Sequence, residues 1–290
     1  MKALTPPNPA SSSRRTDIAL PELMDEAKAF LAQSKSVGRR PLASIHHLAC
    51  TGGTLFAKAL ATMPNVSLIS ELDPFTDRGF RKHRPRFAPA DIIGHLNYVR
   101  QDLPEQVKAN AYEAALRSIL GDLTAIGLQL IIRDHAHSHY CMGESLPERT
   151  THASFLKDVF GARSVVTVRD PTESWQSLGW LKWVDFSPAT FDEYCKRYNR
   201  FLDDHEGLPV FRYEDFVAQP ETVMRDVCGC LGIPYSDSFT LLISAVAATG
   251  DSGRKGASIA AREPKPVPRP LREEMAQSEA YARLCARLGY

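Results

Sequence analysis

The amino-acid sequence predicts an α/β protein in which helices pack on a central, mainly parallel β-sheet. The first observation is alternation, because short β-like runs and helical stretches follow one another along the chain. The second is the apolar character of runs such as "LQLII" and "SVVTV", which is typical of parallel strands buried on both faces. A chain of 290 residues with 43% hydrophobic composition can build one large domain of this class.

Five strands and a set of longer helices are expected from these patterns. The β-like runs occupy residues 44–49, 66–69, 128–133, 164–169 and 208–213. The helical patterns occupy residues 20–34, 54–63, 104–125, 152–160, 172–182, 189–205, 220–231 and 271–288. Residues 1–17 are rich in proline and serine and are expected to be disordered, so we assign residues 18–290 to a single domain.

Charge and cysteine content restrict the partners and the compartment. The net charge of +1 supplies no general attraction for nucleic acid or acidic membranes, so neither is an expected partner. The six cysteines show no spacing typical of a zinc site, which favours reduced thiols. The start of the chain has no apolar core like that of a signal peptide, and no apolar run reaches membrane-spanning length. We expect a soluble, cytoplasmic protein.

The stretch "CTGGT" at residues 50–54 predicts an anion-binding turn between a strand and a helix. Gly52 and Gly53 allow a phosphate to approach the backbone, and the helix end that follows offers N–H groups. Thr51 and Thr54 can add hydroxyl donors. The lysine of the Walker pattern is missing, which argues against ATP or GTP chemistry. Taken alone, the turn is equally well explained by glycines that serve packing.

A second pattern lies in "VVTVRDPTESWQSL". Arg169 ends an apolar strand, Pro171 can open the next helix, and Ser177 stands eight residues after the arginine. The carboxyl end of a strand is where open α/β sheets bind ligands. The alternative is a surface arginine and an exposed serine with no shared role.

In order and spacing, these motifs make the chain resemble the bacterial-type sulfotransferases that use 3′-phosphoadenosine-5′-phosphosulfate (PAPS). The resemblance covers about residues 43–260 and implies a three-layer α/β/α, P-loop sulfotransferase-like fold. It implies that the donor is PAPS, that adenosine 3′,5′-bisphosphate (PAP) is released, and that no metal is needed. The cofactor-binding residues that it implies are Cys50, Thr51, Gly52, Gly53, Thr54, Arg169, Ser177, Tyr213, Arg254, Lys255 and Gly256.

Within that resemblance, Tyr213 in "FRYEDF" is placed near the adenine, and "GRKGAS" at 253–258 is the loop that closes over the 3′-phosphate. One position departs from the family pattern. Many members carry lysine or arginine where this chain has Cys50. We expect Cys50 to be a partly buried, inert thiol, and Arg133 or another basic side chain to replace the missing cation.

Two residues are candidates for the base that takes the acceptor's proton. Glu71 follows the second strand and resembles the base of the Golgi-type branches, and it is our first choice. His135 ends another strand and resembles the base of the cytosolic branches. The alternation of His135, His137 and His139 on an extended segment gives only a weak indication of a metal. We expect His46 and His47 to be packed core residues rather than catalytic ones.

The function that the sequence favours is sulfuryl transfer from PAPS to a hydroxyl or amine of a small-molecule or glycan acceptor. The acceptor and the oligomeric state cannot be read from the sequence, since variable loops at 74–100 and 178–192 would shape the pocket. Residues 175–191 are either a pocket wall or an amphipathic core helix. The alternatives are a small-molecule kinase with an altered P-loop and a non-catalytic protein that binds PAP.

Overall fold

The protein has a central sheet of five parallel strands, as the sequence predicts. The structure, a computed structural model, describes residues 41–76, 104–249, 259–261 and 263–290, with short pieces at 24–25, 28–29 and 92–93. Within these residues the sheet has the order β2-β3-β1-β5-β7. Its strands are β1 (Ala43–His46), β2 (Val66–Leu72), β3 (Gln129–Asp134), β5 (Arg163–Val168) and β7 (Val210–Arg212). A small second sheet pairs β4 (Met142–Gly143) with β6 (Asp185–Phe186).

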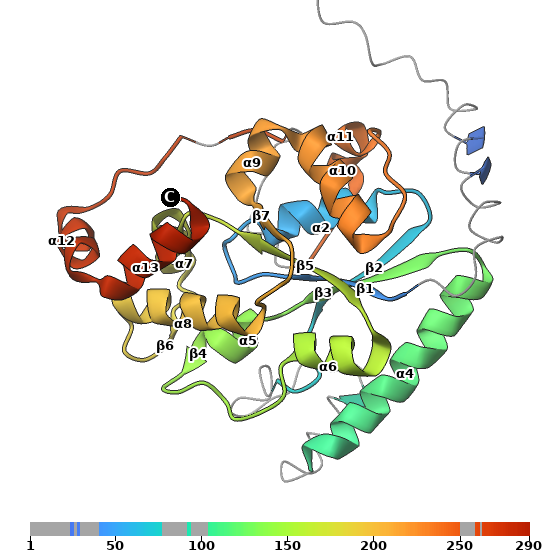
Figure 1. Cartoon of the computed structure of the whole chain (residues 1–290), viewed down its shortest axis with the longest axis horizontal. Helices are drawn as coiled ribbons and strands as arrows, with labels where there is room; N and C mark the ends of the chain where they lie inside the picture. Colours follow the sequence, from blue (N-terminus) through green and yellow to red (C-terminus); the bar gives the residue numbers. More distant parts are fainter. Residues whose placement is uncertain are drawn as a thin grey trace, which may run out of the picture.

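Helices cover both faces of the central sheet and complete a three-layer α/β/α fold (Figure 1). One face carries α2 (Gly53–Ala61), α9 (Tyr213–Ala218), α10 (Pro220–Leu231) and α11 (Phe239–Leu242). The other face carries α4 (Glu105–Ala125), α5 (His137–Tyr140), α6 (His152–Phe160), α7 (Pro171–Leu181) and α8 (Phe191–Asp204). Outside α8 lie α12 (Arg269–Gln277) and α13 (Glu279–Leu288).

The strands bury side chains on both faces, which explains their nearly continuous apolar runs. On β3, Ile131 belongs to the core under α2 and α10, whereas Leu130 and Ile132 belong to the core under α4 and α6. By the same alternation, Arg133 and Asp134, which follow, face opposite sides of the sheet. This alternation of side chains determines which polar groups meet at the ends of the strands.

Three expectations about individual elements need correction. The single helix predicted at 271–288 is two helices, because Ser278 has extended backbone angles and its side chain accepts from the backbone N–H of Tyr281 to cap α13. The strand predicted at 208–213 ends at Arg212, and Tyr213 begins α9. His137 and His139 lie in the short helix α5 rather than on an extended segment, so the alternation that indicated a metal does not place them on one face.

Some predicted features lie outside the described residues. These are the segment 1–17 that was expected to be disordered, most of the helix at 20–34, most of the variable loop at 74–100 and the loop with Arg254, Lys255 and Gly256. All six cysteines are free thiols, as expected for a reduced protein. None of the described helices combines the length and the apolar composition needed to cross a lipid bilayer.

Lys182 offers a test of backbone strain at the end of α7. It caps the helix in the left-handed region, with φ 57°, and its side chain is exposed. A Cβ atom is disfavoured there, whereas glycine adopts this conformation freely. We expect Lys182→Gly to raise the free energy of unfolding by about 0.5–1 kcal/mol in urea denaturation, the relief of strain less the entropy that glycine loses on folding. Lys182→Ala keeps the Cβ atom and should give no gain; an equal gain in both variants would contradict the argument.

Candidate functional site

The glycine turn joins β1 to α2 and has the geometry of an anion cradle. Cys50 and Gly52 both lie at positive φ, 67° and 87°, and Gly53 is the first residue of α2. Gly52 caps the helix without a side chain, so the first N–H groups of α2 are directed out of the helix end. The hydroxyl of Thr51 donates to the carbonyl of Leu48 at 2.8 Å. Thr51 therefore uses its hydroxyl proton inside the turn, and its role as a donor to the ligand stays a prediction.

Both glycines of the turn make room for aromatic rings. A Cβ atom at Gly52 would overlap the ring of Tyr213, and one at Gly53 would overlap the ring of His47. Tyr213 also packs under Arg169, whose guanidinium carbon lies 4.8 Å from the ring centroid. The turn, the end of β5 and the start of α9 are therefore packed together at the same edge of the sheet.

Arg133 connects the glycine turn to the ends of β2 and β3. Its side chain is only 2% exposed, and each nitrogen of its guanidinium group donates a hydrogen bond. The acceptors are His47 Nε2 at 2.9 Å, Ser70 Oγ at 3.0 Å, the carbonyl of Thr249 at 2.8 Å and Thr54 Oγ1 at 2.8 Å. The carboxylate of Glu71 is 3.3 Å from Nη2. A buried cation thus lies against the helix end of the cradle, although Cys50 supplies none.

His47 is the neutral partner of that cation. Burial, followed by the charge of Arg133, lowers the pKa of His47 to about 3. Its Nδ1–H donates to the carbonyl of Leu48, which leaves Nε2 to accept from Arg133. His47 is buried, as predicted, and it also holds the Arg133 side chain through a hydrogen bond.

Glu71 and His135, the two candidate bases, stand at the ends of neighbouring strands. The pairing of β2 with β3 shifts register between Ile69 and Leu72, and Glu71 in this bulge has φ 59°. Bulges redirect side chains, and strained backbone is typical of functional positions. The N–H of His135 donates to the carbonyl of Leu72 at 2.9 Å, which fixes the residue at the end of β3. Of the two candidates, Glu71 is the one paired with Arg133.

Arg169 and Ser177 lie beside the same turn, with Glu173 between them on α7. Arg169 donates to the carbonyl of Cys50 at 3.4 Å and to the carboxylate of Glu173 at 3.1 Å. The other oxygen of Glu173 accepts from the backbone N–H of Lys265 at 2.9 Å. The ammonium group of Lys265 lies 3.3 Å from the hydroxyl of Ser177. Two cations and a hydroxyl therefore meet next to the glycine turn.

Cys50 is partly buried, as expected. Burial raises the pKa of its thiol to about 11, against the opposing charges of Arg169 and Lys265. The thiol therefore stays protonated at neutral pH and packs against the core around α7 and α8.

Sequence comparison assigns the family. A model described as "Sulfotransferase family" matches residues 45–237, which is more than half of the chain. The chain belongs to this family. Comparison with curated proteins yields no match.

Solved structures of other sulfotransferases share the fold. The sulfotransferase domain from the Synechococcus PCC 7002 olefin synthase is 17% identical with a TM-score of 0.53, and the match covers 88% of this chain and 98% of that domain. The sulfotransferase domain from the curacin biosynthetic pathway is 15% identical with a TM-score of 0.52, covering 87% and 99%. At these identities the likeness concerns the fold, and it agrees with the three-layer architecture above.

The contacts of Glu173 and Lys265, and the hydrogen bond between His47 and Arg133, were not predicted from the sequence. The four-residue spacing of Arg169 and Glu173 was a usable signal for their ion pair, although only Glu173 lies in α7. Lys265 carries no comparable local signal, because the segment that holds it is irregular and its partner Ser177 is 88 residues away. For residues 175–191, a pocket wall and an amphipathic core helix were both left open; Trp175 packs against the core, whereas Trp180 is 75% exposed.

Gly53 provides a test of the contact between the turn and His47. By helix propensity alone, Gly53→Ala at the start of α2 should stabilise the protein. The overlap with His47 predicts the opposite, a loss on the order of 1–3 kcal/mol in the free energy of unfolding measured in urea. Gly229→Ala, at an exposed position of α10 with open space around it, should gain up to about 1 kcal/mol. A gain at both positions would show that His47 moves aside without cost.

Proposed function

We propose that this protein transfers a sulfuryl group from PAPS to a hydroxyl or amine of a small-molecule or glycan acceptor and releases PAP. The observation that supports the proposal is that two sets of residues suited to bind anions lie on either side of the glycine turn. On one side, the helix end of the turn meets Arg133 through Thr54. On the other, Arg169 bonds the carbonyl of Cys50 and stands near Ser177 and Lys265. A donor with phosphates at both its 5′ and 3′ positions matches this division.

The reaction places charge where these groups lie. The acceptor's oxygen or nitrogen forms a bond to sulfur while the bond from sulfur to the bridging phosphate oxygen breaks. The electron pair of the broken bond stays on the phosphate of PAP, and the acceptor's proton goes to a base. Backbone N–H groups of the turn, Thr54 and the Arg133 guanidinium stabilise the charge on the departing phosphate without a metal.

We assign the base to Glu71. Its carboxylate lies beside Arg133, on the side of the guanidinium that also meets Thr54, so the base and the leaving phosphate share one organising cation. Its side chain is 25% exposed, which leaves it open to an acceptor. His135 is the second candidate, because it directly follows the adjacent strand.

Arg169, Ser177 and Lys265 are proposed to bind the 3′-phosphate, with Glu173 orienting two of them. One oxygen of Glu173 meets the guanidinium of Arg169, and the other holds the backbone of Lys265. Arginine can grip a phosphate in a bidentate, charge-assisted manner. Tyr213, packed between Gly52 and Arg169, remains our candidate for the adenine contact.

Nucleotide binding tests the donor assignment. PAP should raise the melting temperature of the protein, since a ligand that binds the native state stabilises it. A shift with ATP and Mg²⁺ but none with saturating PAP would favour the kinase alternative. PAP binding without sulfuryl transfer to any acceptor, water included, would favour a non-catalytic binding protein.

Arg169→Ala should weaken PAP binding roughly ten- to hundredfold, because a charged hydrogen bond contributes roughly 1.5–3 kcal/mol. Adenosine 5′-phosphate lacks the 3′-phosphate and should lose much less affinity in the same calorimetric titration. Lys265→Met should show a smaller loss of the same kind. Lys157→Met, at an exposed position of α6, is the charge-matched control and should change nothing. An equal loss for both nucleotides would mean that Arg169 serves the fold or the 5′ end.

The identity of the base is tested in single-turnover sulfuryl transfer from PAPS, with water as acceptor until a better one is found. Glu71→Gln should lose about 10²–10⁴-fold in rate while PAP affinity stays near that of the wild type. A carboxylate base keeps transfer active below neutral pH, whereas a histidine base loses rate as pH falls through about 6.5. His135→Asn should affect acceptor positioning more than the chemical step. Full activity in Glu71→Gln, with none in His135→Asn, would assign the base to the histidine.

A further inference from the structure

Asp134 is a fully enclosed carboxylate between two residues of the candidate site, Arg133 and His135. Its Oδ2 accepts from His46 Nδ1 at 2.8 Å, and its Oδ1 accepts from His152 Nδ1 at 3.1 Å. Burial by itself would raise the pKa of this carboxyl, but the hydrogen bonds from His152 and His46 outweigh it and hold the pKa well below its usual range. Asp134 is therefore a buried negative charge that depends on two histidines.

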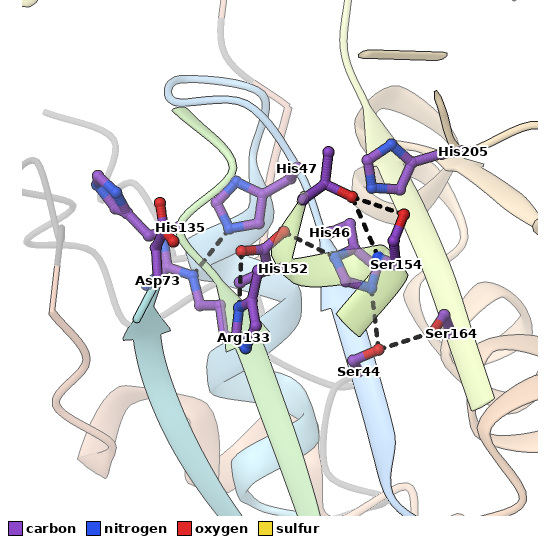
Figure 2. Close-up of polar contacts among 12 residues, drawn as sticks. Ser44, His46, His47, Asp73, Arg133, His135, His152, Ser154, Ser164 and His205 are labelled. Atoms are coloured by element: carbon purple, nitrogen blue, oxygen red, sulfur yellow. Dashed lines mark hydrogen bonds and ion pairs between the residues drawn. The ribbon is translucent and has the colours of Figure 1, made fainter. Parts of the chain in front are cut away.

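Both histidines are anchored in turn. His152 Nε2 lies 2.9 Å from the hydroxyl of Tyr112 on α4. His46 Nε2 lies 2.9 Å from Ser44 Oγ, which meets Ser164 Oγ on β5 at 2.7 Å (Figure 2). A continuous chain of hydrogen bonds thus runs from α4 through α6, β3 and β1 to β5. Such networks hold their members in one arrangement when every polar group has a partner.

The chain of hydrogen bonds has a counterpart on the opposite face of the sheet. Ile45 of β1 pairs with Arg133 of β3, so the residues that follow on each strand are neighbours. On the α2 face, Arg133 donates to His47; on the other face, His46 bonds Asp134. The chain at the end of β1 is therefore joined to the end of β3 on both faces of the sheet, through His46 on one face and His47 on the other. We call His46, His47, Arg133 and Asp134 the β1–β3 clamp.

A metal ion is a competing explanation for the buried histidines. Among the described residues, His46, Asp134 and His205 could offer ligand atoms that lie within 4.8 Å of one another. Both oxygens of Asp134, however, already accept hydrogen bonds from histidines. An ion would have to displace the bond from His46, so the hydrogen-bonded clamp explains the arrangement better.

We propose that Asp134 is a positioning residue for sulfuryl transfer, which acts by keeping Arg133 aligned on Thr54 and Glu71. The inference rests on the proposed function, since it assumes that Arg133 stabilises the leaving phosphate. The physical reason is local. Asp134 fixes the end of β3 from one face of the sheet, and Arg133 leaves the same strand end toward the other face.

Asp134→Asn is the direct test, because asparagine keeps the shape and removes the charge. With one oxygen, it can no longer accept from both histidines in their present arrangement. Small displacements at a reacting centre can cost up to about a hundredfold in rate. We expect single-turnover transfer from PAPS to fall about 10–100-fold, while the dissociation constant of PAP changes by less than about threefold. Loss of PAP binding in step with the rate would overturn the proposal.

A double-mutant cycle separates positioning from general damage. If Asp134 acts through Arg133, then Asp134→Asn should cause no further loss of rate in an Arg133→Gln background. Tyr112→Phe removes the hydroxyl at the far end of the same network and should lower the melting temperature with little effect on rate. Full additivity in the cycle, or an equal loss of rate in Tyr112→Phe, would overturn the proposal and leave Asp134 a purely structural residue.

A measurement that does not depend on sulfuryl transfer can test the inference separately from the proposed function. The ¹⁵N resonance of His47 Nε2 reports its hydrogen bond from Arg133. It should shift in Asp134→Asn and stay unchanged in Tyr112→Phe. If the wild type transfers no sulfuryl group, the proposed function fails, but this resonance still tests the clamp. If Asp134→Asn does not fold, His152→Leu removes one donor and keeps the carboxylate, and it should produce the same shift. An unchanged His47 signal in a folded variant would overturn the inference.

Discussion

The arrangement of the candidate site depends on one buried cation. A guanidinium removed from water must have partners for its N–H groups, because an unpaired buried donor or charge is costly. Arg133 finds them on separate parts of the chain: His47 beside the glycine turn, Thr54 at the start of α2, Ser70 and Glu71 at the end of β2, and the carbonyl of Thr249. Any shift of one of these elements would leave a donor of Arg133 unsatisfied. The cation therefore sets the relative position of the turn and the candidate base.

The parallel sheet explains why these residues can meet at all. All five strands of the central sheet run in one direction, so their carboxyl ends gather along one edge. The turn after β1, Glu71 at the end of β2, His135 after β3 and Arg169 after β5 reach that edge from separate segments. Two of the positions there, Cys50 and Glu71, hold positive φ values that are costly for residues other than glycine. Their backbone is held by surrounding contacts and not by local preference.

The polar residues at the ends of β1 and β3 make different contacts on the two faces of the sheet. On the α2 face, the polar contacts of β1 and β3 serve the glycine turn. On the opposite face, Asp134, His46 and His152 form a buried network that does not reach the turn. Because side chains alternate along a strand, adjacent residues serve both purposes with no extra length of chain. The use of adjacent residues on opposite faces accounts for the polar residues in "IHH" and "IIRDH", which interrupt otherwise apolar strands.

The sequence by itself determined the α/β class, the positions of the five central strands and most helices, and the candidate residues of the glycine turn and of Arg169 and Ser177. These rest on local patterns, such as apolar runs, glycine turns and strand-end motifs, that do not depend on distant contacts. Only the tertiary structure decided that Arg133 meets Thr54, that Lys265 meets Ser177 and that Asp134 meets His46, pairs separated by 79, 88 and 88 residues. It also decided that Tyr213 begins a helix and that Ser278 divides one. Hydrophobic periodicity tells which face of an element is buried, but the partner of a buried polar group is chosen by how the elements pack.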